Sequence, residues 1–90
     1  MAAWRFLITK EAENDLAKLD TQIRKKVIVK LDWFAENFDW IVPLPLGGTW
    51  RGFFKLRVGD LRIIYEVDQE AKAVVVHLIG RRDQIYKRKQ

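Results

Sequence analysis

The chain has 90 residues, of which 49% are hydrophobic and 32% charged. So short a chain cannot fill two stable cores, which predicts one domain over residues 1–90. The sequence contains no cysteine, which excludes disulfides and thiolate metal sites and favours a reducing, cytoplasmic setting. No apolar stretch is long enough to cross a bilayer, so we expect no membrane partner. The net charge of +5 predicts an anionic partner.

The first half of the chain predicts one strand and two helices. Residues 4–8, WRFLI, are rich in aromatic and branched side chains, which favours a strand. Thr9 is a suitable N-cap for a helix that begins at Lys10, and Asp20 caps a second, longer helix. The apolar face of this second helix repeats at helical spacing through Ile23, Val27, Leu31, Phe34 and Phe38.

The second half predicts strands. Residues 41–52, IVPLPLGGTWRG, indicate an irregular connection, because two prolines remove backbone donors and two glycines interrupt the chain. Three strand patterns follow, at residues 53–58, 61–67 and 72–79. Each helix has one apolar face to bury. We therefore expect an α+β fold, in which two N-terminal helices cover one face of a small, mainly antiparallel sheet in the order β-α-α-β-β-β.

Gly59 and Asp60 separate two of these strands, which is typical of a two-residue hairpin turn. The resulting register places Arg57 directly opposite Arg62, with Cβ atoms about 5 Å apart. Like charges across about 6 Å repel by about 3 kcal/mol at an effective dielectric of about 20, and by less than about 1 kcal/mol in full solvent. Either both side chains splay into water, or they bind an anion such as a phosphate, which turns the repulsion into attraction. The other face of this hairpin is apolar and consists of Phe54, Leu56, Val58, Leu61, Ile63, Tyr65 and Val67.

Further polar residues join the charged face of the hairpin. Lys55 precedes Arg57 on the same side of its strand. If residues 68–71 form a four-residue loop, Val67 pairs with Lys72 and His77 pairs with Arg62; a structural and a catalytic role for this histidine are both open. The tail after the last strand is basic and carries one aromatic residue: Arg81, Arg82, Tyr86, Lys87, Arg88 and Lys89.

The segments FFKLRVGDLRIIYEVD and VVVHLIGRRDQIYK resemble the RelE/ParE toxin superfamily, and specifically its RelE-like mRNA interferases. The resemblance covers the whole chain and is most specific in the second half. It implies the toxin of a type II toxin-antitoxin system, an endoribonuclease that enters the ribosomal A site and cuts mRNA there. It also implies a cognate RelB-like antitoxin that holds the toxin inactive in a hetero-oligomer.

The resemblance assigns roles to individual residues. The implied catalytic residues are Lys55, Arg57, Arg62, Arg82 and Tyr86. Arg81 is the alternative to Arg82 as the catalytic arginine. The remaining residues expected to contact RNA are Arg81, Lys87, Arg88 and His77. One departure concerns Phe53, which stands where the best-known members have a second hairpin lysine.

RNA cleavage through the 2′-hydroxyl requires a base, positive charge on the phosphorane and a proton for the leaving oxygen. A single histidine cannot form a catalytic pair, and the carboxylates do not cluster in the sequence, so we expect neither a metal nor another cofactor. A cationic site remains. Repulsion from the arginines favours the uncharged amine at Lys55, which can accept a proton, while Arg62 stabilises the phosphate. Tyr86 would stack on a base or orient the 2′-hydroxyl.

Two other functions remain open. A ParE-like protein of the same fold would poison DNA gyrase without cutting RNA, although the joint presence of the predicted catalytic residues favours the nuclease. A basic binding module without activity is the third hypothesis. The four tryptophans either all pack in the core or partly form a surface for an acidic, amphipathic partner; they are Trp4, Trp33, Trp40 and Trp50.

Overall fold

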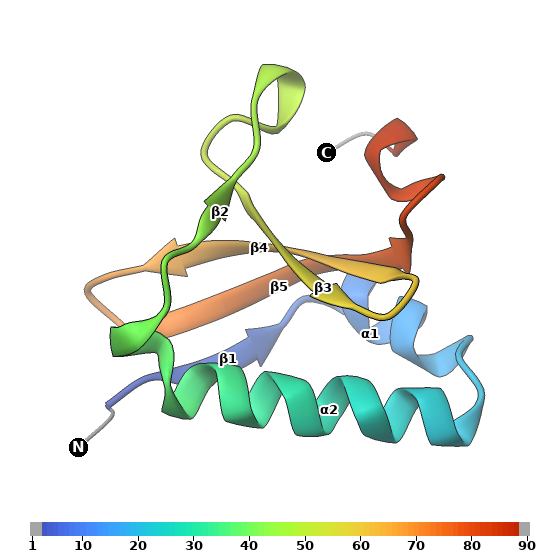
Figure 1. Ribbon diagram of the computed structural model, residues 1–90, viewed down its shortest axis with the longest axis horizontal. Helices are drawn as coiled ribbons and strands as arrows, with labels where there is room; N and C mark the ends of the chain where they lie inside the picture. Colours follow the sequence, from blue (N-terminus) through green and yellow to red (C-terminus); the bar gives the residue numbers. More distant parts are fainter. Residues whose placement is uncertain (1–2, 89–90) are drawn as a thin grey trace.

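The computed structural model describes residues 3–88, so Lys89 of the basic tail lies outside the described residues. Five strands form one sheet in the order β1-β5-β4-β3-β2 (Figure 1). The elements are β1 (Arg5–Ile8), α1 (Lys10–Ala17), α2 (Thr21–Glu36), β2 (Leu44–Pro45), β3 (Phe54–Val58), β4 (Leu61–Asp68) and β5 (Ala73–Arg81). β1 runs parallel to β5, and every other pairing is antiparallel. The predicted α+β class is confirmed. No helix within residues 3–88 is long and apolar enough to cross a membrane.

Both predicted helix starts are confirmed. The Thr9 hydroxyl accepts a hydrogen bond from the backbone N–H of Ala12, at 3.2 Å. The Asp20 carboxylate accepts two bonds from the first turn of α2. The second helix is shorter than its apolar pattern suggests, because it ends at Glu36 and Phe38 lies in a 3-10 turn. Phe38 is nevertheless buried, so the pattern identified a core residue beyond the end of the helix.

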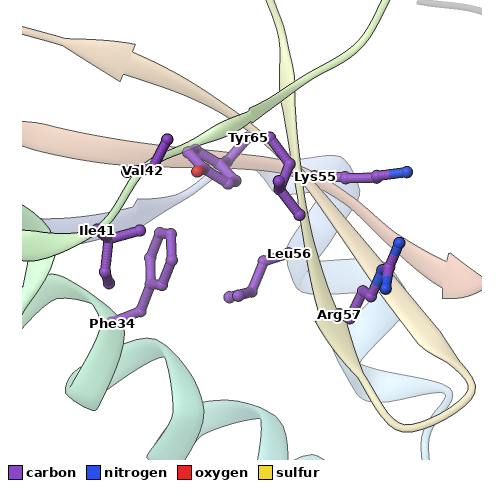
Figure 2. A pocket seen from close by; sticks show the side chains of 8 residues that line it. Phe34, Ile41, Val42, Lys55, Leu56, Arg57 and Tyr65 are labelled. Atoms are coloured by element: carbon purple, nitrogen blue, oxygen red, sulfur yellow. The ribbon is translucent and has the colours of Figure 1, made fainter.

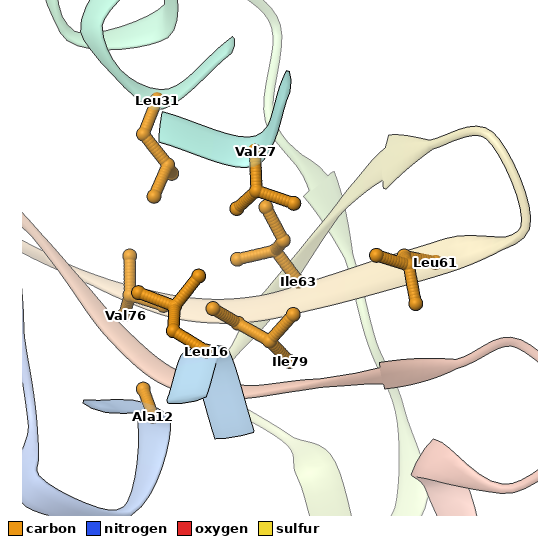
Figure 3. Close-up of a cluster of buried hydrophobic side chains, with 8 residues drawn as sticks. All are labelled: Ala12, Leu16, Val27, Leu31, Leu61, Ile63, Val76 and Ile79. Carbon is orange, nitrogen blue, oxygen red and sulfur yellow. The ribbon is translucent and has the colours of Figure 1, made fainter. Parts of the chain in front are cut away.

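The main core lies between the two helices and the sheet. Side chains from both helices meet β4 and β5 in one cluster (Figure 3), formed by Ala12, Leu16, Val27, Leu31, Leu61, Ile63, Val76 and Ile79. A second, aromatic cluster continues this core under the other end of α2, with Phe34, Phe38, Tyr65 and Val74. All seven residues of the predicted apolar hairpin face belong to these clusters or pack against them, as predicted.

The segment at residues 41–52 is more ordered than its prolines and glycines indicated. Leu44 and Pro45 form β2 at the edge of the sheet, where a proline without an N–H is tolerated. Residues Gly48–Trp50 form a 3-10 turn that buries Trp50. This loop and the C-terminal turn lie on the opposite side of the sheet from α2 (Figure 1). There they enclose a third cluster, Trp50, Ile64, Leu78 and Ile85, so the outer face of the sheet is partly covered.

The predicted pairing of the last strand is wrong. Val67 pairs with Val74 and not with Lys72, because β4 extends to Asp68 and the four-residue loop lies one position later. Lys72 ends this loop with φ 52°, a left-handed conformation that is unusual outside glycine and that breaks the strand pattern at this position. The register then shifts again at a β-bulge between Ile64 and Tyr65.

Candidate active site

The β3–β4 hairpin holds the charged residues at the centre of the site. Gly59 adopts φ 57° in the turn, a conformation that glycine reaches without strain. The predicted register is confirmed: Arg57 lies opposite Arg62, and the other four cross-strand pairs, including Lys55 opposite Ile64, follow from the same turn. The hairpin turn alone is therefore sufficient to set which side chains share the outer face.

The three cationic side chains of the hairpin have different surroundings. The Arg62 Nη1 group donates to the carbonyl oxygens of Gly59 and Leu61, both at 2.9 Å. These bonds hold Arg62 toward the turn. Within residues 3–88, Lys55 and Arg57 form no ion pair with a carboxylate. Their charged ends point away from α2 (Figure 2). An incoming anion would therefore find positive charge that no protein carboxylate neutralises.

The C-terminal tail folds back over the outer face beside Arg62. Arg62 pairs with Gly80 in β5, and a methyl group added at Gly80 would lie 3.6 Å from the side chain of Ile85. Ile85 is buried in the third cluster, which anchors the short turn Ile85–Lys87. The Trp50 indole donates to the backbone oxygen of Tyr86 at 3.3 Å. These contacts hold the tail against the outer face and leave the Tyr86 side chain exposed.

The two tail arginines have different surroundings. Arg81 pairs with Leu61 and lines a cavity with Ile23 and Lys26 of α2, so it faces the helical side. Arg82 follows the end of β5, and its backbone N–H donates to the Asp60 carbonyl at 2.9 Å, which ties the tail to the hairpin turn. A polar cavity of about 190 Å³ lies there between Asp60, Arg81, Arg82 and Asp83. Because Arg81 faces the helical side, Arg82 is the better candidate for the catalytic arginine.

His77 does not lie beside the arginines, so its predicted pairing with Arg62 is wrong. The bulge leaves His77 opposite no residue of β4, because Tyr65 pairs with Val76 and Ile64 pairs with Leu78. The His77 Nε2 atom lies 3.0 Å from the Glu66 carboxylate, and its ring stands edge-on to Phe53 with centroids 5.2 Å apart. Glu66 and Phe53 therefore hold His77 farther along the outer face.

Arg88, which the sequence places among RNA-contacting residues, is held by α1. Its guanidinium bonds to the carboxylates of Asp15, at 3.0 Å, and Glu11, at 3.1 Å. Desolvation lowers the pKa of Arg88, but the hydrogen bonds and charges of Asp15 and then Glu11 more than offset it, so the net pKa is raised. The Asp15 carboxylate also accepts the backbone N–H of Ile79 at 2.9 Å. Arg88 thus fastens the tail to the body of the protein, whereas Lys87 is exposed.

Sequence reasoning missed the platform that positions the tail, namely Trp50, Ile85 and Gly80. Apolar residues on the outer face, Ile64 and Leu78, were the available signal that this face carries a small core of its own. In the part of the chain that the structure describes, no three acidic, histidine or cysteine side chains group closely enough to hold a metal ion.

Comparison with known proteins identifies the class. The family model for the ParE toxin of the type II toxin-antitoxin system parDE matches residues 6–86. The protein is therefore a toxin of a type II toxin-antitoxin system. The chain belongs to the RelE/ParE toxin superfamily, which confirms the resemblance seen in its sequence. The comparison with curated proteins found no match.

Solved structures of the superfamily share the fold. The toxin-antitoxin complex RelBE2 from Mycobacterium tuberculosis contains a chain with 28% identity and a TM-score of 0.80, and the match covers 91% of this chain and 94% of that one. A mutant of Escherichia coli RelE in the free state is 23% identical, with a TM-score of 0.75 and coverage of 96% and 90%. The YoeB/ParE toxin from Agrobacterium tumefaciens is 20% identical, with a TM-score of 0.66 and coverage of 86% and 96%. The last two likenesses bear on the fold alone.

Proposed function

We propose that this toxin is a metal-independent endoribonuclease that cuts mRNA in the A site of the ribosome. The observation that carries the proposal is the cross-strand placement of Arg57 opposite Arg62, with Lys55 two residues away on the same face. Such a pair destabilises a hairpin in the absence of an anion. A bound phosphate reverses the sign of the interaction, because guanidinium groups donate paired hydrogen bonds to its oxygens.

The residues suit cleavage through the RNA 2′-hydroxyl. Lys55, in its uncharged form, takes the proton of the 2′-hydroxyl, and the 2′-oxygen attacks the adjacent phosphorus. The bond to the 5′-oxygen then breaks, leaving a 2′,3′-cyclic phosphate and a 5′-hydroxyl whose proton comes from water. Arg57 and Arg62 stabilise the negative charge of the phosphorane, and Arg82 adds positive charge near the leaving oxygen. Tyr86 stacks on a neighbouring base.

The ribosome and an antitoxin complete the proposed system. A shallow site of this kind gains most from a substrate that is already oriented, and mRNA held in the A site supplies that orientation. A RelB-like antitoxin would hold the toxin inactive in a cytoplasmic hetero-oligomer. Support comes from the similar structure from Mycobacterium tuberculosis, which is itself a toxin-antitoxin complex. The exposed Trp33 and Trp40 offer apolar surface for such a partner.

The test is in-vitro translation with purified toxin, followed by mapping of mRNA 5′ ends. We expect cuts within the A-site codon that disappear with Arg62→Ala. Arg62→Lys keeps the charge but loses the paired geometry, so we expect it to lose at least about tenfold in cleavage rate. The control is Arg5→Ala, which removes an exposed arginine from β1 at the edge of the sheet remote from β3. Equal cleavage by the wild type and Arg62→Ala would contradict the proposal.

The second candidate function is poisoning of DNA gyrase. The observation that favours it is the matching family model, which describes a ParE toxin. A gyrase poison would leave mRNA intact and cause gyrase-linked DNA breaks to accumulate. Measuring both readouts with the same preparation of toxin separates the two functions.

A further inference from the structure

A cavity of about 200 Å³ opens on the helical side of β3, next to the proposed active site. It forms because β2 pairs with β3 only at Leu44 and Pro45, while the preceding chain turns away toward α2. Figure 2 shows this cavity, which is lined by Phe34, Ile41, Val42, Leu44, Lys55, Leu56, Arg57 and Tyr65. An apolar cavity of roughly 150 Å³ is known to hold a benzene molecule, so this one has room for a branched or aromatic side chain.

One polar atom in this apolar lining has no partner. The Tyr65 hydroxyl is buried and makes no hydrogen bond within residues 3–88. The ring cannot easily turn away, because it packs against Phe34 at 5.2 Å and Phe54 at 5.6 Å between centroids. Burial raises the pKa of Tyr65, so the hydroxyl stays protonated and remains a hydrogen-bond donor. A buried donor without an acceptor is rare in folded proteins and calls for an explanation.

The mouth of the cavity is apolar on one side and basic on the other. Val42 is 83% exposed and lies beside the Tyr65 hydroxyl (Figure 2), and Leu44 is 43% exposed. Lys55 and Arg57 line the other side of the mouth, and their charged ends extend beyond β3 (Figure 2). A segment that leaves the cavity over β3 therefore meets the two hairpin cations that the active site uses.

We propose that this cavity is the docking site for an acidic segment of the antitoxin, anchored by one branched aliphatic side chain. The anchor fills the cavity, and a carbonyl or carboxylate oxygen of the segment accepts the Tyr65 hydrogen as Val42 moves aside. Acidic side chains of the segment then pair with Lys55 and Arg57. Charge complementarity selects this occupant, since the mouth is basic and the chain carries a net charge of +5.

This assignment rests on the proposed function, and it specifies how that function is switched off. With Lys55 and Arg57 covered, no phosphate can reach the arginine pair, so docking and RNA binding exclude one another. The same contacts would also explain why the hydroxyl is left without a partner in the free toxin.

The first test measures the affinity of purified toxin for its purified cognate antitoxin by titration calorimetry. We expect Val42→Glu to weaken binding at least tenfold, because it places a negative charge at the mouth of the cavity. The matched control is Leu7→Glu, which changes an aliphatic residue that is 44% exposed in β1, at the opposite edge of the sheet from β2. It should weaken binding twofold or less. Equal effects of the two variants would overturn the proposal.

The second test is Tyr65→Phe, which keeps the ring and removes the hydroxyl. Free Tyr65→Phe toxin should have a higher Tm than the wild type, because a buried donor without an acceptor is lost. The same variant should bind antitoxin at least fivefold more weakly. A raised Tm with unchanged antitoxin affinity would overturn the docking site, and would leave the proposed function intact if A-site cleavage persists. If the wild type showed no A-site cleavage but the variants still weakened antitoxin binding as expected, only the proposed function would be refuted.

Discussion

Arg88 forms ion pairs with Asp15 and Glu11 of α1, and we call these contacts the clamp. The clamp makes a sharp prediction about the tail. Replacing Arg88 with alanine leaves the Asp15 carboxylate, whose side chain is only 9% exposed, with the backbone N–H of Ile79 as its remaining donor. Losing one partner of a fully buried ion pair costs roughly 3–5 kcal/mol. The Arg88 side chain is 32% exposed, so water can reach the vacated position and we reduce this cost to about 2 kcal/mol.

The predicted loss is large for a protein of this size. At about 4–8 °C per kcal/mol, the Tm of Arg88→Ala should fall by roughly 8–16 °C. Urea unfolding followed by circular dichroism gives the free energy directly. The fluorescence of the tryptophans provides a local readout, because the Trp50 indole bonds to the backbone of Tyr86 and becomes more exposed if the tail detaches.

Two controls separate the clamp from a general effect of lost charge. Lys87→Ala removes an exposed neighbouring cation and should change the stability by less than about 0.5 kcal/mol. In an Asp15→Asn background, Arg88→Ala should cost clearly less than in the wild type, because the charged partner is already gone. If Arg88→Ala and Lys87→Ala were equally stable, the assignment of Arg88 to the clamp would be refuted.

Three further predictions concern the hairpin, the tail and the buried tyrosine. Arg57→Glu should raise the Tm by about 2–8 °C, because it replaces a repulsion with Arg62 of up to about 1 kcal/mol by an attraction. The same substitution should abolish mRNA cleavage. A Tm below that of the wild type would refute the repulsion. Gly80→Ala should be nearly neutral in urea unfolding, since its methyl group would lie 3.6 Å from Ile85, whereas Gly80→Leu should displace Ile85 and cost at least about 1 kcal/mol. Burial raises the pKa of Tyr65, so its contribution to stability is fully present below the unfolded pKa of 10.0 and is lost as the pH rises above it. The wild type should therefore lose up to about 1.4 kcal/mol per pH unit more than Tyr65→Phe above pH 10; parallel pH profiles would contradict this.

Local signals in the sequence were sufficient for much of the fold and for the centre of the candidate site. Thr9 and Asp20 start their helices because their side chains bond to backbone N–H groups within three residues, a contact that needs no tertiary structure. Gly59 and Asp60 set the hairpin register for a similar reason, since a two-residue turn leaves one alignment of the flanking strands. The placement of Arg57 opposite Arg62 followed from that turn, and no contact with a distant part of the chain altered it.

Contacts between residues far apart in the chain decided the rest. The position of His77 depended on where the β4–β5 loop begins and on a bulge, and a shift of one residue there changes every pairing. In the sequence, Arg88 resembles the other cations of a basic tail. In the structure, it bonds to Asp15, which lies 73 residues away in the sequence. The cavity beside Tyr65 exists because the chain diverges from β3 before Leu44. The deciding contact is a strand pairing for His77, an ion pair for Arg88 and packing for the cavity, and each depends on the assembled fold and not on neighbouring residues.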